Sequence, residues 1–267
     1  AAPRRVRRMP QPTEPARICG AAAVAALFAP RPATILRLFF TEARRIEAGP
    51  ICAALAKGRK PYREVPPEEL ARIAGTPHHG GICAIAVPRV VPTLPWPPPP
   101  VLSAAPVLPV LHAIGNPHNL GAIARSAAFF GCRAMVLSAD PRSAGPSDSA
   151  HRVAEGGLDL LDLFRAAEWP AVVRGLARSH LTVAAVAEGG EPPEVIPRGT
   201  PIALVLGNEE DGLDRATIAA CAARVTLPRR GQVQSLNVAQ AAAVLIHGLL
   251  PPIPAGPSLH PGRKAAI

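Results

Sequence analysis

The sequence has few aromatic residues, which make up only 3% of its 267 residues. Proline is abundant instead, with 34 residues, and so are alanine and arginine, which indicates a composition bias of the source rather than a function. The hydrophobic fraction of 48% is typical of a globular protein and excludes a disordered chain. At this length we expect one large domain or two smaller ones, each with its own core.

Cysteine is present without any pattern. The five cysteines are widely scattered, with no CxxC pair and no cluster with histidine at the spacing of zinc ligands. We therefore predict no metal site, and reduced thiols in a cytoplasmic protein. The apolar run at 18–30 is too short to span a bilayer, so neither a signal peptide nor a membrane segment is predicted.

Acidic residues are outnumbered, with 19 Asp and Glu against 29 Lys and Arg, which leaves a net charge of +10. Arginine dominates over lysine, and its guanidinium binds phosphate as a two-pronged fork. This balance favours a polyanionic partner, either nucleic acid or an anionic membrane surface; biased composition is the alternative. The polar tail at 1–16 adds Arg4, Arg5, Arg7 and Arg8, which are expected to contact nucleic-acid phosphates or to remain solvated.

Several catalytic signatures are missing. The sequence holds no phosphate-binding loop, no GxGxxG fingerprint, no HExxH and no GxSxG. Without the glycine fingerprint and an acid about 20 residues later, a nicotinamide enzyme on a doubly wound sheet is disfavoured.

A proline-rich segment separates two α/β patterns. Residues 88–109 contain nine prolines, and we expect an extended, semi-rigid linker at 88–106. It separates a small α/β domain at 17–87 from a larger one at 107–251, and a tail follows at 252–267. Alternation of strands and helices in the larger part predicts a mostly parallel sheet covered on both faces. We expect strands at 35–41, 62–65, 82–87, 107–114, 134–137, 182–187, 202–206 and 224–227, and helices at 21–28, 49–57, 67–73, 119–130, 166–179, 213–221 and 235–250.

Three polar loops follow apolar strands of the larger part. They run from Gly115 to Arg125, from Leu206 to Leu213 and from Leu227 to Val238. Because ligands of parallel sheets bind beyond the carboxyl ends of the strands, three such loops together predict a ligand site. The alternative for the third loop is a surface turn that ends with Ser235 as the N-cap of a buried, almost wholly apolar helix.

Two charged residues in these loops are candidates for chemistry. Arg125 lies on a mostly apolar helix, where a charge is costly unless it is paired, so a functional role is favoured over a solvated one. Glu209 can pair with an arginine and hold it. Gly207 and Gly212 allow tight turns and close backbone approach.

In their order and spacing, the three loops resemble the three motifs of the SpoU/TrmH family of RNA ribose 2′-O-methyltransferases. The segment at 152–157 is similar to a further family segment, and those at 18–21 and 78–83 resemble the family's small substrate-binding domain. The subgroup that the chain resembles most is the uncharacterised tRNA/rRNA methyltransferases. The matching residues are Asn116, Pro117, Asn119, Gly121, Ala122 and Arg125 in the first motif, Gly207, Glu209 and Gly212 in the second, and Leu227, Pro228, Gly231, Ser235, Leu236, Asn237 and Val238 in the third.

The resemblance implies a C-terminal α/β trefoil-knot (SPOUT) methyltransferase domain and a small N-terminal L30e-like α/β domain. It implies a homodimer that acts on RNA, either rRNA or tRNA, with the site near the dimer interface. It also implies S-adenosylmethionine as cofactor, with contacts from Leu206, Gly207, Leu227, Leu236 and Asn237.

The resemblance also suggests a role for each candidate. Arg125, held by Asn119 and Glu209, is expected to accept or stabilise the proton change at a ribose 2′-hydroxyl, while Ser235 and Asn237 position the ribose. An inactive RNA-binding protein of the same fold, acting in ribosome assembly, is the alternative, and the intact set of these residues argues against it. The candidate RNA contacts, which are otherwise merely exposed or solvated, are His78, His79, Arg229 and Arg230.

Overall fold

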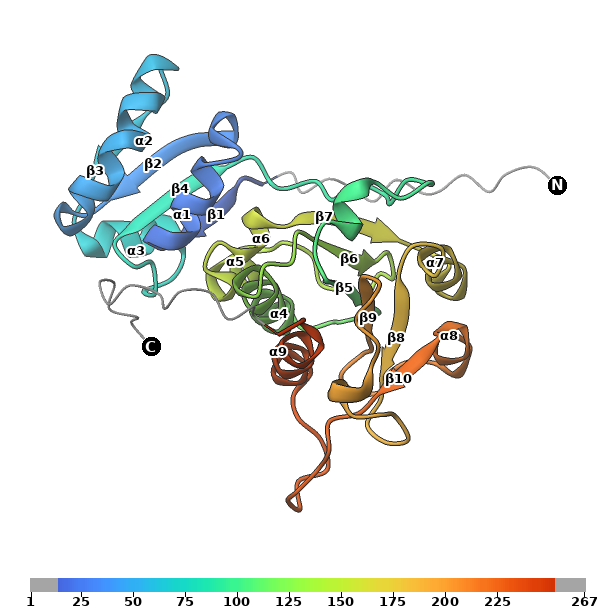
Figure 1. The fold of residues 1–267 in the computed structure, drawn as a ribbon. Coiled ribbons are helices and arrows are strands. Elements are labelled where there is room, and N and C mark those ends of the chain that lie inside the picture. The colour runs from blue at the N-terminus through green and yellow to red at the C-terminus, as the bar shows by residue number, and fades with distance from the viewer. Residues whose placement is uncertain (1–13, 253–267) are drawn as a thin grey trace.

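The computed structural model describes residues 14–252, which form two β-sheets with their helices (Figure 1). The smaller sheet has the order β1-β4-β2-β3, and its neighbouring strands are antiparallel except for the parallel pair β2 and β3. Val24 and Leu27 of α1 are buried in the same core as Leu38 of the sheet. The elements are β1 (Ala16–Cys19), α1 (Ala21–Phe28), β2 (Ile35–Phe40), α2 (Arg45–Lys57), β3 (Tyr62–Glu64), α3 (Pro67–Ala74) and β4 (Ile82–Ala86).

The larger sheet has six strands, all parallel, in the order β10-β8-β9-β5-β6-β7. The chain leaves β5 toward β6 on one side and later returns to pair β9 on the other side, so the strand order reverses beside β5. The elements are β5 (Val107–Leu111), α4 (Pro117–Phe129), β6 (Ala134–Ser138), α5 (Asp148–Ala154), α6 (Gly157–Leu160), β7 (Asp162–Ala166), α7 (Trp169–Leu176), β8 (Leu181–Ala185), β9 (Ile202–Leu206), α8 (Arg215–Ala220), β10 (Ala223–Val225) and α9 (Val238–Leu249).

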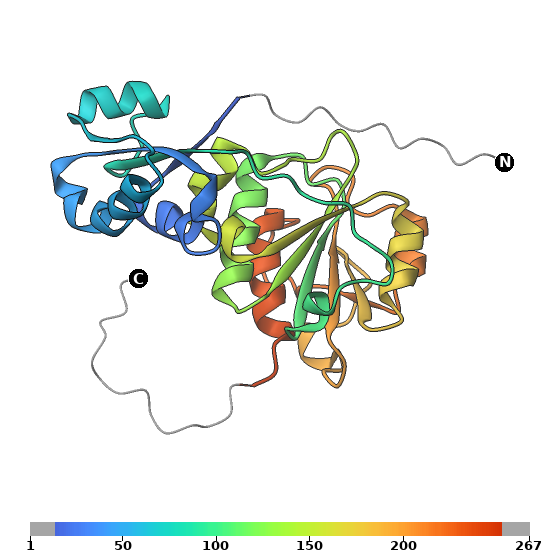
Figure 2. The ribbon, with the colours of Figure 1, turned by 90° about the horizontal axis from the view of Figure 1, so that it is seen from above.

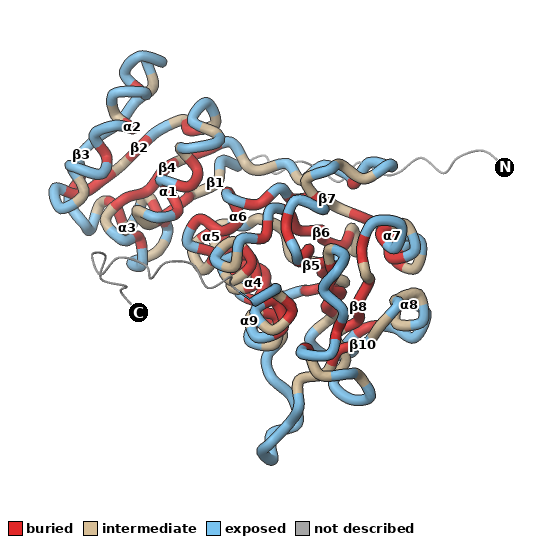
Figure 3. The backbone as a smooth tube through the Cα atoms, viewed as in Figure 1, coloured by how far each residue is buried: buried red, intermediate tan, exposed pale blue. Residues whose placement is uncertain are grey.

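Helices cover both faces of the larger sheet, as the sequence predicts (Figure 2). Helices α4, α5, α6 and α9 share one core with the sheet, and α7 and α8 share the core on the opposite face. Every residue of β5 and β9 is buried, which explains why these strands are continuous apolar runs. Burial is concentrated along the strands in Figure 3. Within residues 14–252, no helix combines the length and hydropathy needed to cross a membrane.

The outer strands of the larger sheet are partly paired by irregular segments. The proline-rich segment lies along β7, where the backbone N–H of Leu94 donates to Arg165 and the N–H of Arg165 donates to Pro92, both at 2.7 Å. Leu94 is buried, so the segment is extended as expected but packs on the sheet and is not a free spacer. At the other edge, Glu191 exchanges backbone hydrogen bonds of 3.0 and 2.9 Å with Arg224 and Thr226 of the β10 strand region.

Strands β1 and β7 and helices α5 and α6 are absent from the predicted set. Strand β7 reads Asp-Leu-Phe-Arg-Ala, and its polar positions hide it, so the helix predicted at 166–179 shortens to Trp169–Leu176. Helices α5 and α6 form in a stretch where none was predicted, and β1 precedes the first predicted helix. Tertiary packing, and not local apolar pattern, stabilises these segments.

Helix α9 begins later than predicted and is not buried on every face. Its N-cap is Asn237, whose side chain accepts a hydrogen bond from the backbone N–H of Ala239 at 2.9 Å, so Ser235 is not the cap. Gln240 is exposed and Val244 is 49% exposed. The small alanines of this helix made it look apolar all round, although one side faces solvent.

A buried ion pair joins the part of the chain that forms the smaller sheet to the part that forms the larger sheet. It lies where α1 and β1 pack against α5 and α6 (Figure 1). Arg31, which follows α1, donates to the carboxylate of Asp159 in α6, and His151 Nδ1 lies 3.3 Å from the second oxygen of that carboxylate. The side chain of Asp159 is fully buried. Burial raises the pKa of Asp159, but the contact with His151 and the charge of Arg31 outweigh burial and hold this pKa below its ordinary value.

Replacing Arg31 tests this contact. Arg31→Ala is expected to lower the free energy of unfolding by about 3–5 kcal/mol, because it removes one of the partners of a buried carboxylate. Arg63→Ala is the control, since it removes the exposed Arg63–Glu69 pair and should change stability little. Urea unfolding followed by circular dichroism measures both variants. Equal unfolding midpoints for the two variants would contradict a stabilising role for the Arg31–Asp159 pair.

Candidate functional site

Each of the three predicted loops begins at the carboxyl end of a strand of the larger sheet. The first two follow β5 and β9, which are direct neighbours in the sheet. The third follows β10, which is separated from β9 by β8, and it reaches the site only through α9, which packs against α4. The strand reversal beside β5 therefore places the first two loops together, at the position where parallel sheets bind ligands.

The carboxylate of Glu209 connects the first two loops. It accepts a hydrogen bond from Nδ2 of Asn119 at 2.8 Å and lies 3.3 and 3.4 Å from the backbone nitrogens of Gly115 and Asn116. These donors surround the N-terminus of α4, where free N–H groups and the helix dipole favour an anion. Partial burial raises the pKa of Glu209, but the hydrogen bonds from Asn119 and the backbone lower it overall, so Glu209 is held as an anion.

Asn237 connects the third loop to this pair. Its Nδ2 donates to Oδ1 of Asn119 at 3.1 Å, and Asn119 is buried. One chain of hydrogen bonds, Asn237–Asn119–Glu209, therefore joins all three loops. The structure thus brings together three of the residues that we predicted to act in catalysis.

The turn after β9 is closed by tight backbone packing. A Cβ atom at Gly207 would lie 2.3 Å from the carbonyl carbon of Gly212, so no side chain fits there. Asn208 fixes the same turn, because its Nδ2 donates to the carbonyl of Ala113 at 2.9 Å and its Oδ1 accepts from the backbone N–H of Glu210 at 2.8 Å. We did not predict a role for Asn208; its position in a glycine-bounded turn was the available signal.

Arg125 points away from this hydrogen-bonded chain. Its Nη1 lies 3.0 Å from Oε1 of Glu155 at the end of α5, and both side chains are more than half exposed. The prediction that Asn119 and Glu209 hold Arg125 is therefore wrong within this chain. Arg125 follows Asn119 by six residues along α4. At this spacing two side chains of an α-helix point in directions about 120° apart, so Arg125 and Asn119 lie on different sides of α4.

The third loop is exposed from Pro228 to Asn237 and extends from the sheet into solvent (Figures 1 and 3). Ser235, Arg229 and Arg230 all lie in this exposed part, and none of the three forms a side-chain hydrogen bond or ion pair with the described residues 14–252. Among the described residues, Ser235 therefore forms no hydrogen bond with Asn119 or Glu209.

The remaining candidate contacts differ in exposure. His78 is exposed, as an RNA contact requires. His79 is buried, and its Nδ1 accepts a hydrogen bond from the backbone N–H of Gly81 at 3.0 Å, so it serves the turn itself. The four arginines predicted in the N-terminal tail, Arg4, Arg5, Arg7 and Arg8, lie outside the described residues.

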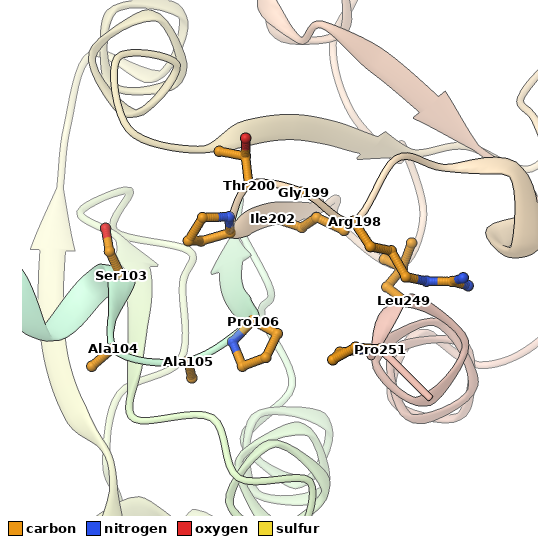
Figure 4. A pocket seen from close by; sticks show the side chains of 11 residues that line it. Ser103, Ala104, Ala105, Pro106, Arg198, Gly199, Thr200, Ile202, Leu249 and Pro251 are labelled. Atoms are coloured by element: carbon orange, nitrogen blue, oxygen red, sulfur yellow. The ribbon is translucent and has the colours of Figure 1, made fainter. Parts of the chain in front are cut away.

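A pocket of about 310 Å³ lies at the opposite end of the strands, where the central strands of the larger sheet begin (Figure 4). Pro106 and Ile202 line it where β5 and β9 begin, together with Leu249 at the end of α9. None of the predicted site residues lines this pocket. It is separate from the three loops, which leave the carboxyl ends of the strands.

Comparison with protein families covers both halves of the chain. A model of the SpoU rRNA Methylase family matches residues 106–247, which include all three loops. A second model, described as RNA 2′-O ribose methyltransferase substrate binding, matches residues 17–89. The chain belongs to the SpoU rRNA methylase family. It is therefore an RNA ribose 2′-O-methyltransferase.

Relatives of this SpoU methylase include two kinds of bacterial protein. The uncharacterized tRNA/rRNA methyltransferase YfiF of Escherichia coli O157:H7 is 31% identical over 241 residues, which cover 88% of this chain and 68% of YfiF. The 23S rRNA (guanosine-2′-O-)-methyltransferase RlmB of Nitrosomonas europaea is 35% identical over 143 residues, which cover 52% of this chain and 54% of RlmB. The similarity to the YfiF-type protein thus extends over both sheets.

Solved structures share the fold. The AdoMet-bound rRNA methyltransferase from Sinorhizobium meliloti superimposes with a TM-score of 0.71 at 21% sequence identity, covering 89% of this chain and 87% of that one. A putative RNA methyltransferase of the TrmH family from Porphyromonas gingivalis gives a TM-score of 0.66 at 22% identity and covers 89% of this chain and 90% of that one. Both likenesses bear on the arrangement of strands and helices alone.

The loops of the SpoU methylase fit a cofactor that is recognised through main-chain groups. Within the described residues, backbone atoms of 227–236 form no hydrogen bond, so their N–H and C=O groups remain available. Leu236 and Val233 of this loop expose 51% and 76% of their surface and offer apolar contact. At Gly207 the backbone itself, and no side chain, borders the end of β9.

Gly207→Ala tests the tight turn after β9. The added Cβ must displace backbone atoms of Gly212 and Leu213, which should lower stability by about 1–3 kcal/mol. We expect S-adenosylmethionine binding to weaken roughly tenfold or more, measured by calorimetry. Gly231→Ala, where a Cβ meets nothing within 4 Å, is the matched control in the third loop. Unchanged binding by Gly207→Ala would show that the turn is not part of the cofactor site.

Proposed function

We propose that the chain of hydrogen bonds Asn237–Asn119–Glu209 is the structural centre of the methyltransferase site. It ties the three loops together at the carboxyl ends of the parallel strands, and it is the observation that carries the proposal. The substrate would be structured rRNA or tRNA, since the family model over residues 17–89 describes an RNA substrate-binding region. An inactive RNA-binding protein would have no need of these mutually oriented amides, of which that of Asn119 is buried.

The cofactor would be held by main-chain groups at Leu206, Gly207, Leu227 and Leu236, with Asn237 closing the pocket. Leu206 is buried at the end of β9, and Leu227 packs against the core at the start of the third loop. S-adenosylmethionine supplies a methyl group already activated by its positive sulfur. The protein therefore needs mainly to align the ribose oxygen with that methyl group.

Arg125 would supply the positive charge that the reaction needs. A ribose 2′-hydroxyl is a very weak acid, so negative charge that develops on its oxygen must be stabilised. A guanidinium remains protonated in proteins, which favours electrostatic stabilisation by Arg125 over proton abstraction, with a substrate phosphate or water taking the proton. Ser235 would position the ribose.

RNA contacts would come from both halves of the chain. His78, Arg229 and Arg230 are exposed in the structure, and the arginine-rich N-terminal tail would add charge. We further propose that residues 17–87 and 107–251 are separate domains joined by the 88–106 segment. A trefoil knot at the third loop and a cytoplasmic location stay predictions.

Arg125→Ala tests the assignment of the reaction. Wild-type and variant proteins are incubated with radiolabelled S-adenosylmethionine and total RNA, and the 2′-O-methyl positions are then mapped. We expect kcat about 100- to 1,000-fold lower in the variant, because charge stabilisation is lost in the transition state, with unchanged cofactor affinity. Arg133→Ala, at an exposed arginine where β6 begins, is the control. A wild-type protein that binds cofactor but labels no RNA fraction would favour the inactive RNA-binding protein.

We also propose a homodimer that packs through α4 and α9. These neighbouring helices expose Phe129, at 82%, and Val244, at 49%, which would supply apolar contacts at the interface. The methyltransferase site, which begins at the N-termini of the same helices, would then lie near the dimer interface.

Phe129→Asp is expected to convert the dimer to a monomer, because it places a charge in an apolar interface. Light scattering after size exclusion measures the mass. Ile46→Asp introduces the same charge at an 89% exposed position of α2, distant from α4, and should leave the mass unchanged. A wild-type protein that is monomeric at micromolar concentration would overturn the dimer.

A further inference from the structure

The partner of Arg125 lies in a turn with an unusual backbone. Glu155 follows α5 with a φ of 44°, in the left-handed region that residues with a Cβ seldom adopt, and Gly156 continues the turn with a φ of 96°. Backbone of this kind persists only where surrounding structure enforces it. The position of the Glu155 carboxylate is therefore set by the packing of the turn, and not by an exposed ion pair, which contributes little stability by itself.

Two consecutive glycines hold this turn in place, because each lies in close contact with a neighbouring helix. A Cβ at Gly156 would lie 2.5 Å from the Cβ of Ala26 in α1. A Cβ at Gly157 would lie 2.6 Å from the carbonyl oxygen of Ala124 and 2.8 Å from the backbone nitrogen of Arg125 in α4. The turn is thus packed closely between α1, which belongs to the smaller sheet, and α4, which carries Arg125.

Polar contacts fix the same segment from the N-terminal side. Arg89 donates to the carbonyl groups of Leu158 and Leu161, and the backbone N–H of Arg17 donates to Asp148 at 3.0 Å. Together with the buried pair between Arg31 and Asp159, these contacts attach α5 and α6 to the beginning of the smaller sheet, to the segment after α1 and to the segment that follows the sheet.

We propose that Glu155 is a positioning residue for Arg125, and that the docking of the 17–87 region on α5 and α6 determines where Glu155 presents its carboxylate. The carboxylate orients the guanidinium, 3.0 Å away, on a side of α4 that neither Asn119 nor Glu209 reaches. The orientation of Arg125 then depends on how the RNA-binding half is seated. This inference rests on the proposed role of Arg125 in methyl transfer.

The test replaces the charge of Glu155 and leaves its shape. Glu155→Gln is expected to lower kcat ten- to a hundredfold, since a misplaced catalytic group has effects of this size. The melting temperature, the RNA dissociation constant and the cofactor dissociation constant should not change, because the pair is exposed. Glu155→Asp keeps the charge on a shorter side chain and should retain more activity than Glu155→Gln.

Glu168→Gln is the matched control. Glu168 is also an exposed glutamate in the left-handed region, with a φ of 49°, but it begins α7 on the opposite face of the sheet. It should keep wild-type kcat. A loss of activity in this variant equal to that of Glu155→Gln would attribute the effect to surface charge in general and overturn the proposal.

The Arg125→Ala background separates this inference from the proposed function. Under single-turnover conditions, Glu155→Gln should cause no further loss in that background, because Glu155 acts only through Arg125. An equal loss in both backgrounds, or wild-type kcat for Glu155→Gln beside an inactive Arg125→Ala, overturns the role of Glu155. Full activity of Arg125→Ala instead removes the proposed function on which the inference rests.

Discussion

The ionised carboxylate of Glu209 is the interaction on which the site depends. It satisfies backbone N–H groups at the start of α4 and at the same time orients the Asn119 amide, which in turn receives a hydrogen bond from Asn237. The carboxylate offers two acceptor oxygens to these donors, whereas the amide of a glutamine in its place would offer one. The first two loops therefore meet at one anion, because the strand reversal beside β5 places β5 next to β9, and the third loop joins them through Asn119.

Much of the fold could be predicted because its central strands are buried on both faces. Such strands are continuous apolar runs, and the loops that leave their carboxyl ends were recognisable as a group. Strand β7 and helices α5 and α6 were not predictable in this way, because their polar residues obscure the period that reveals an element. They are stabilised by contacts with segments distant in sequence, such as the pairing of β7 with β6, the packing of α5 and α6 on α4, and the contact of Arg31 with Asp159, and these contacts are invisible in local sequence.

The site was predictable in membership more than in geometry. The motif spacing identified Asn119, Glu209 and Asn237, which the structure joins directly. It did not identify the partner of Arg125, because a spacing along a helix does not say which neighbouring segment faces each side. Glu155 was part of a noticed segment, but its contact with Arg125 depends on two glycines that let helices approach closely.

The partly paired outer strands of the larger sheet bear on how copies of this protein can assemble. An open strand edge is a template for pairing with another chain, and it commonly leads to aggregation. Here the prolines beside β7 offer few N–H donors, and Glu191 occupies hydrogen-bonding groups next to β10. Continuation of the sheet from one molecule into the next is therefore disfavoured at both ends. Association is left to helical surfaces, where side chains and not backbone groups decide which partner fits.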